Sequence, residues 1–144
     1  QERYEEAETV FRQWLDVSKE YLGEEYWLTI DLYSTIGWAL NGQKRYSEAE
    51  KILVSCYEIS NNKYVKTTSA WWLGESLFWQ GKYAQAEEYL TYSFNNSSDI
   101  SIELGFHQVI RLLVDLYVAM DNSDEAQKYR DMLPAEVNEK MILD

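Results

Sequence analysis

Side chains that could carry out catalysis are scarce in this sequence. His107 is the only histidine and has no cysteine or acidic cluster at metal-ligand spacing, while Cys56, the only cysteine, has no neighbouring base to activate it. A phosphate-binding glycine loop, a Gly-x-Ser-x-Gly motif, a His-Glu-x-x-His motif and a calcium loop are all missing. We therefore expect no enzyme activity, no metal and no cofactor. His107 is predicted to be a structural or surface residue, and Cys56 a small buried one.

The composition restricts the partners and the compartment. The 144 residues include 13 basic and 25 acidic ones, a formal net charge of −12. Because nucleic-acid binding relies on many cationic contacts, we expect no nucleic-acid partner. Apolar residues make up 46%, too many for a disordered chain, yet they form no uninterrupted run of about 18, so we expect no membrane span. A single cysteine fits a reducing compartment, and we predict a cytoplasmic location.

A short pattern recurs four times along the chain. Its copies are Arg3-Tyr4-Glu5-Glu6-Ala7-Glu8, Arg45-Tyr46-Ser47-Glu48-Ala49-Glu50, Lys82-Tyr83-Ala84-Gln85-Ala86-Glu87 and the weaker Asn122-Ser123-Asp124-Glu125-Ala126-Gln127. The alanines are 42, 37 and 40 residues apart. A second pattern precedes the last three alanines by 13 residues each time, as Ile36-Gly37, Leu73-Gly74 and Leu113-Val114. Because the two patterns are separated by the same 13 residues in three places, they indicate tandem repeats.

Each repeat is predicted to contain two helices. Apolar residues follow helical spacing on both sides of each turn, and no alternating run predicts a strand. The expected helices cover about 3–21, 26–41, 46–60, 65–80, 83–95, 101–120 and 123–132. Ser47 and Ser123 are expected to be helix N-caps. A glycine inside a helix costs up to about 1 kcal/mol relative to alanine, so the recurrence of Gly37 and Gly74 at one register predicts a close helix crossing.

These residues resemble the tetratricopeptide repeat. The third repeat carries the resemblance best, through Trp71-Trp72-Leu73-Gly74, Leu77, Gly81-Lys82-Tyr83, Ala86 and Leu90. The second repeat matches at Tyr33, Ile36-Gly37, Leu40, Tyr46, Ala49 and Leu53, with Lys44 in place of the turn glycine. The resemblance implies an all-α, right-handed superhelix of tandem helix-turn-helix repeats. The 42-residue first spacing, with Tyr21-Leu22-Gly23-Glu24-Glu25 after it, is similar to the kinesin light chain-like subtype.

The resemblance also divides the chain. The expected segments are helix B of a truncated first repeat (1–22), a second repeat (23–62), a third repeat (63–98), a degenerate fourth repeat (99–133) and a C-terminal tail or capping helix (134–144). Helix A of the first repeat is missing from this division. We therefore expect the chain to be a fragment of a larger protein, with possible self-association through the uncovered face of its N-terminal helix.

By resemblance, the chain is a protein–protein interaction module, a scaffold or regulatory segment whose first helices line a concave groove. The expected groove residues are Ser34, Trp38, Asn41, Trp71, Glu75, Phe78, Arg111 and Asp115. Related grooves hold acidic C-termini with Lys, Arg and Asn, and at these positions this chain has only Arg111 and Asn41. The carboxylates Glu75 and Asp115 instead favour a basic or apolar-aromatic peptide or helix.

The tryptophans divide into two expected groups. We expect Trp72 and Trp79 in the core, and Trp38 and Trp71 partly exposed in the groove, where aromatic anchors are typical of binding sites. Two other functions fit the same residues. The chain could be a ligand-sensing regulatory segment of a larger signalling enzyme such as a kinase or ATPase, or its helices could form a wall of an enzyme's active site.

Overall fold

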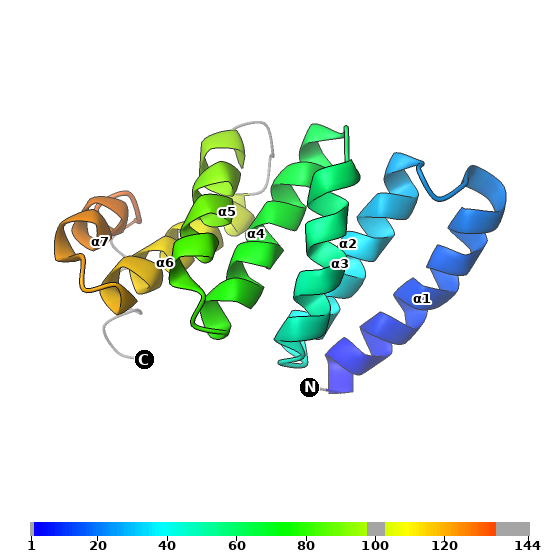
Figure 1. The fold of residues 1–144 in the computed structure, drawn as a ribbon, viewed down its shortest axis with the longest axis horizontal. Helices are drawn as coiled ribbons and strands as arrows, with labels where there is room; N and C mark the ends of the chain where they lie inside the picture. The colour runs from blue at the N-terminus through cyan, green and yellow to red at the C-terminus, as the bar shows by residue number, and fades with distance from the viewer. Residues whose placement is uncertain (1, 98–102, 135–144) are drawn as a thin grey trace.

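The computed structural model describes residues 2–97 and 103–134, and seven helices account for most of them (Figure 1). The helices are α1 (Glu2–Leu22), α2 (Trp27–Gly42), α3 (Tyr46–Ile59), α4 (Lys63–Trp79), α5 (Tyr83–Asn96), α6 (Glu103–Ala119) and α7 (Ser123–Arg130). They pack in chain order as antiparallel pairs, which confirms the predicted all-α class. Apart from Pro134, the predicted tail or capping helix at 134–144 lies outside the described residues.

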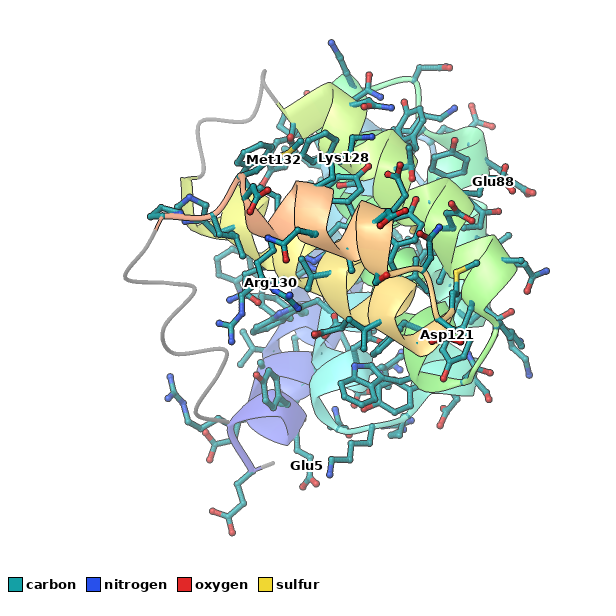
Figure 2. The ribbon with its side chains drawn as sticks, turned by 90° about the vertical axis from the view of Figure 1, so that its left-hand side faces the viewer. Glu5, Glu88, Asp121, Lys128, Arg130 and Met132 are labelled. Atoms are coloured by element: carbon teal, nitrogen blue, oxygen red, sulfur yellow. The ribbon has the colours of Figure 1, made fainter. Side chains whose placement is uncertain are left out.

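The helices form two layers. Helix α2 contacts α4, and α4 contacts α6, so the even-numbered helices form one layer. The odd-numbered helices pack on them from the other side, with α3 in front of α2 and α5 in front of α6 in Figure 1. At the end of the array, α7 carries Lys128, Arg130 and, just after its last turn, Met132 (Figure 2). The even-numbered layer therefore holds the surface on which the predicted groove residues lie.

The predicted close crossings are confirmed at Gly37 and Gly74. A Cβ atom at Gly37 would lie 2.5 Å from Cγ of Leu53, and one at Gly74 would lie 2.5 Å from Cγ of Leu90. Both leucines are fully buried and cannot move aside without disturbing the core. The glycines thus let α2 approach α3 and α4 approach α5.

A recurring glutamate links each repeat to the next. It follows the repeat alanine directly, and its carboxylate accepts hydrogen bonds from the next pair of helices. The contacts run from Gln43 Nε2 (2.6 Å) and Arg45 Nη1 (2.8 Å) to Glu8, from Gln80 Nε2 (2.8 Å) and Lys82 Nζ (2.7 Å) to Glu50, and from Tyr117 Oη (2.8 Å) to Glu87. Burial acts to raise the pKa of Glu8 and of Glu50, but hydrogen bonds and nearby positive charges, which for Glu8 include Arg12, outweigh it and lower both pKa values.

The N-cap predictions are wrong. Helix α3 begins at Tyr46 and α7 at Ser123, so Ser47 and Ser123 lie inside the first turn. Asn122 caps α7 instead, because its side chain accepts a hydrogen bond from the backbone N–H of Glu125 at 3.3 Å. No side-chain cap bond is present at α3, whose N-cap position is Arg45.

The turn between paired helices places one residue in the left-handed region of φ. Glycine occupies this position in one repeat, where Gly81 has φ 75°, while Lys44 with φ 62° and Asp121 with φ 58° occupy it in two others. A residue with a Cβ atom pays about 1–2 kcal/mol in this conformation. Lys44 therefore stores backbone strain that a glycine would release.

Replacing Lys44 by glycine is expected to raise the free energy of unfolding by about 0.5–1 kcal/mol, since glycine removes the strain but adds entropy to the unfolded chain. Urea unfolding followed by circular dichroism measures the change. The reverse substitution Gly81→Ala serves as the control and is expected to lower stability. A destabilised Lys44→Gly protein would contradict this account of the turn.

Candidate functional site

The structure places Ser34 inside the molecule, not on the groove surface. Its side chain is 0% exposed, and its Oγ lies 2.8 Å from Oγ of Ser69, across the contact between α2 and α4. The expectation that Ser34 lines an accessible groove is therefore wrong. Helical spacing identifies the correct face of α2, but it cannot show that α4 approaches this face closely enough to cover it.

Asn41 is buried at the same α2–α4 contact and is fully hydrogen-bonded. Its Nδ2 donates to the carbonyl of Trp72 at 2.8 Å and to Oε2 of Glu75 at 3.2 Å, while its Oδ1 accepts from Oγ of Ser76 at 2.6 Å. Asn41 thus orients the Glu75 carboxylate and does not itself reach solvent. The structure brings these two predicted groove residues together.

Glu75 is half-buried on α4. Burial raises its pKa, and the hydrogen bond from Asn41 only partly offsets this. The carboxylate also contributes, after burial, to the raised pKa of the Tyr46 hydroxyl. Within the described part of the chain, no cationic side chain contacts this carboxylate. Glu75 is therefore a desolvated acid without a counter-charge among the described residues.

The Glu75→Gln variant is expected to be more stable than the wild type at pH 7. A folded-state pKa above the unfolded value means that the native state holds the proton more tightly, so the contribution of Glu75 to stability falls as the pH rises above about 4. Urea unfolding at pH 7 and at about pH 4 measures the difference in unfolding free energy between the variant and the wild type. The variant should be more stable at pH 7, and the difference should disappear at about pH 4. The exposed Glu58→Gln is the control, and an equal gain at both pH values would argue against burial as the cause.

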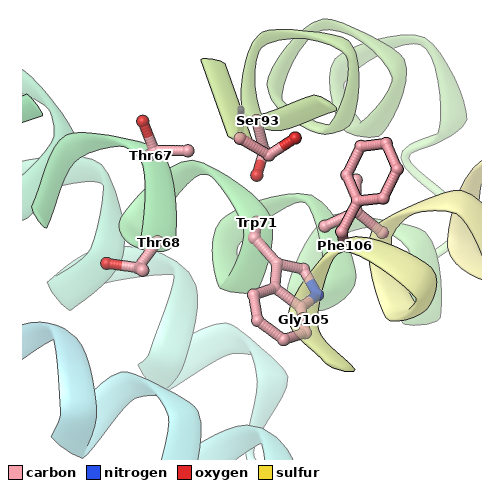
Figure 3. Close-up of a pocket in the computed structure, with 8 residues that line it drawn as sticks. Thr67, Thr68, Trp71, Ser93, Gly105 and Phe106 are labelled. Atoms are coloured by element: carbon pink, nitrogen blue, oxygen red, sulfur yellow. The ribbon is translucent and has the colours of Figure 1, made fainter. Parts of the chain in front are cut away.

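Trp38 and Trp71 are both half-buried, which confirms that they are partly exposed. The rings of Trp38 and Tyr4 form a T-shaped pair with a centroid distance of 5.2 Å. Trp38 also lines a hollow of about 370 Å³ with Tyr4 and Phe11 of α1. The ring centroids of Trp71 and Trp72 are 5.9 Å apart. Figure 3 shows Trp71 beside a small cavity between α4, α5 and α6. Aromatic surface is thus available on both α2 and α4.

The prediction for Trp79 is wrong. Trp72 is half-buried and packs against the core, as expected. Trp79, however, is 56% exposed, and its ring stacks on Tyr46 with an angle of 16° between the ring planes. The tyrosine of the repeat pattern explains this placement. In each of the first three repeats it pairs with a ring of the even-numbered layer, as Tyr4 with Trp38, Tyr46 with Trp79 and Tyr83 with Phe78. The recurring tyrosine is the sequence signal that could have identified these pairs.

Arg111 and Asp115 lie one turn apart on α6, which contacts α4. Arg111 is half-buried and Asp115 is exposed. Partial burial raises the pKa of Asp115, and Arg111 and Arg130 act against this shift. Phe78 is half-buried and contacts the rings of Trp79 and Tyr83. The accessible part of the predicted groove therefore combines aromatic rings with two carboxylates and one arginine.

Cys56 is unsuited to act as a nucleophile. Cys56 is buried, its thiol points to the carbonyl of Ile30 at 3.7 Å, and burial raises its pKa to about 12, so the thiolate is not available at neutral pH. Among the described residues, no group of three or more histidine, cysteine, aspartate and glutamate side chains could hold a metal ion. Likewise, no helix in the described part is long and apolar enough to cross a membrane.

Comparison with known families agrees with the repeat geometry. The tetratricopeptide repeat model matches residues 1–62, which include α1, α2 and α3. No curated protein was found to match the chain. The recurring glycine crossings, the antiparallel helix pairs and this match lead to one conclusion. Over residues 1–62 the chain is similar to the tetratricopeptide repeat family.

Proposed function

We propose that this chain is a protein–protein interaction module, a segment of a scaffold or regulatory array, that binds a peptide or helix on its even-numbered layer. Tetratricopeptide repeats generally mediate protein–protein interactions. The observation that carries the proposal is Glu75, a half-buried carboxylate without a cationic partner among the described residues, on the same helix as Trp71 and Phe78. An acid that costs stability is commonly retained for binding.

The partner that fits this surface is basic or apolar-aromatic. Trp38, Trp71 and Phe78 offer ring surface of the kind that anchors binding hot spots. Glu75 and Asp115 would pair with Lys or Arg of the partner, and the net charge of −12 favours approach of a cationic segment. Ser34 and Asn41 are excluded from direct contact because both are buried. Their role is to hold α2 against α4.

The proposal has three further features. The 42-residue spacing between Ala7 and Ala49 supports the kinesin light chain-like subtype. The buried, unreactive Cys56 supports a binding role in place of catalysis and is compatible with a reducing, cytoplasmic location. The even-numbered layer, not a cofactor, is proposed to recognise the partner.

Selection from a phage-displayed library of random peptides tests the proposal, because it requires no assumption about which protein is the partner. We expect the selected peptides to carry Lys or Arg beside an apolar or aromatic anchor. Their affinity should fall by at least about tenfold for a chain with Trp71→Ala and Glu75→Lys together. The matched control is Glu58→Lys with Ile59→Ala, two exposed positions on α3. Acidic selected peptides, or unchanged affinity for the Trp71 and Glu75 variant, would overturn the proposal.

A further inference from the structure

Trp79 ends α4 with more than half of its surface exposed, at 56%. Its indole stacks on Tyr46 of α3 with the ring centroids 6.3 Å apart, and Phe78 meets it in a T-shaped arrangement at 5.1 Å. Helix α4 lies between α2 and α6 (Figure 1), so the neighbouring repeats are in place and still leave this ring uncovered. The ring is therefore positioned by two other rings and accessible to a partner.

Glu75 lies one turn before Trp79 on the same face of α4. Side chains four residues apart in a helix have Cβ atoms about 5–6 Å from each other. Among the described residues, only Asn41 donates to the Glu75 carboxylate, at Oε2, so Oε1 has no donor. The carboxylate is also close enough to the Tyr46 hydroxyl to contribute, after burial, to its raised pKa. The ring pair and the incompletely paired carboxylate are therefore neighbours.

The equivalent place on α2 is closed. Counted from the repeat glycines, Trp38 holds the position of Glu75, and Gly42 holds the position of Trp79. The Tyr4 ring lies against Gly42, where an added Cβ atom would overlap it. The same Tyr4 ring also packs on Trp38. Helix α2 thus offers neither a carboxylate nor an open ring at this place.

The equivalent place on α6 has an acid but no ring. Counted from Val114, which stands where the other repeats have glycine, the two positions carry Asp115 and Ala119. The positive charges of Arg111 and Arg130 act on Asp115 and oppose the rise of its pKa. Of the three even-numbered helices that the structure describes, only α4 therefore joins an exposed ring to a carboxylate without a nearby cation.

Arginine is the cation that fits this combination best. Its planar guanidinium can stack on an aromatic ring while the N–H groups at its edge donate to a carboxylate. It is also more weakly hydrated than the lysine ammonium, so bringing it to the half-buried Glu75 costs less desolvation. The ring face adds attraction to either cation. Arginine is thus favoured over lysine by both the shape and the burial of the site.

We propose that Trp79, Tyr46 and Glu75 form a subsite for an arginine side chain of the partner. The guanidinium stacks on the exposed Trp79 ring and donates to Glu75, while Tyr46 holds the Trp79 ring in place. This inference rests on the function proposed above and narrows its basic partner to one that presents arginine. Trp71, one turn before Glu75, is then available to the partner's apolar anchor.

A fluorescence anisotropy titration of the full chain tests the subsite. The probe is a basic peptide selected from the displayed library on the wild-type chain, synthesised with arginine, lysine or citrulline at its basic position. Citrulline keeps the planar shape of arginine without the charge, and lysine keeps the charge without the planar shape. We expect the arginine peptide to bind at least about tenfold more tightly than either of the others.

Two variants assign these preferences to the two parts of the subsite. Glu75→Gln should remove the preference for arginine over citrulline, because it removes the charge and keeps an oxygen that accepts from Asn41. Trp79→Leu should remove the preference for arginine over lysine. The matched controls are Glu58→Gln, exposed on α3, and Trp14→Leu, whose ring is 64% exposed on α1. Both controls should keep both preferences.

The possible failures of this inference and of the proposed function differ. Equal affinity of the wild-type chain for the arginine and lysine peptides would overturn the subsite but leave the binding of basic peptides intact. A preference that survives the variant assigned to it would mean that the arginine binds elsewhere, and it too would overturn only the subsite. Acidic selected peptides, or none at all, would overturn the proposed function and the subsite with it.

Discussion

The Gly74→Ala variant is expected to unfold with a free energy about 1–3 kcal/mol below that of the wild type, even though alanine is the better helix former by about 1 kcal/mol. The added Cβ would lie 2.5 Å from Cγ and 2.7 Å from Cδ2 of Leu90, and 3.3 Å from the Leu90 backbone nitrogen. Leu90 is fully buried, so α4 and α5 must move apart to admit the methyl group. Urea unfolding measures the loss.

A double-mutant cycle separates the overlap from any other effect of Gly74→Ala. In a Leu90→Ala background the methyl group has room, so Gly74→Ala should be neutral or stabilising by up to about 1 kcal/mol. This change of sign is specific to a steric cause. A similar loss in both backgrounds would show that the close crossing of α4 and α5 does not limit residue 74.

The Asn41→Ala variant is expected to lose about 2–4 kcal/mol of folding free energy. The amide donates to the Trp72 carbonyl and to Glu75, and it accepts from Ser76. Its removal leaves the Glu75 carboxylate half-buried without a donor, and the pKa of Glu75 should rise further. The loss should therefore be larger at pH 7 than at about pH 4, where Glu75 is protonated.

Asn95→Ala is the control for this experiment, since Asn95 lies on α5 with its side chain exposed and should change stability by less than about 0.5 kcal/mol. Thermal unfolding at the two pH values follows both variants. If Asn41→Ala matched Asn95→Ala at pH 7, the hydrogen bonds of Asn41 would contribute nothing to holding α2 against α4.

The sequence predicts the repeat architecture well because repetition tests each inference several times. Gly37 and Gly74 occur at one register, and both face a buried leucine of the next helix. Cys56 has the small, buried position that its place in the repeat predicts. These features depend on contacts between neighbouring helices in one repeat, which helical spacing describes directly.

Other features depend on contacts between repeats, which spacing within one helix does not describe. Ser34 lies on the expected face of α2, yet Ser69 of α4 covers it. The seven-residue spacing from Trp72 predicts a core position for Trp79, but Trp79 is 56% exposed and its ring stacks on Tyr46.

Fluorine NMR of the chain labelled with 5-fluorotryptophan tests the binding proposal most directly, because the six tryptophans report on separate surfaces. Single Trp→Phe variants assign each resonance. On titration with a basic peptide selected on the wild-type chain, the resonances of Trp38 and Trp71 should shift, while that of Trp14 stays in place. A shift confined to Trp14, or no shift at Trp38 and Trp71 at saturating peptide, would contradict binding on the even-numbered layer.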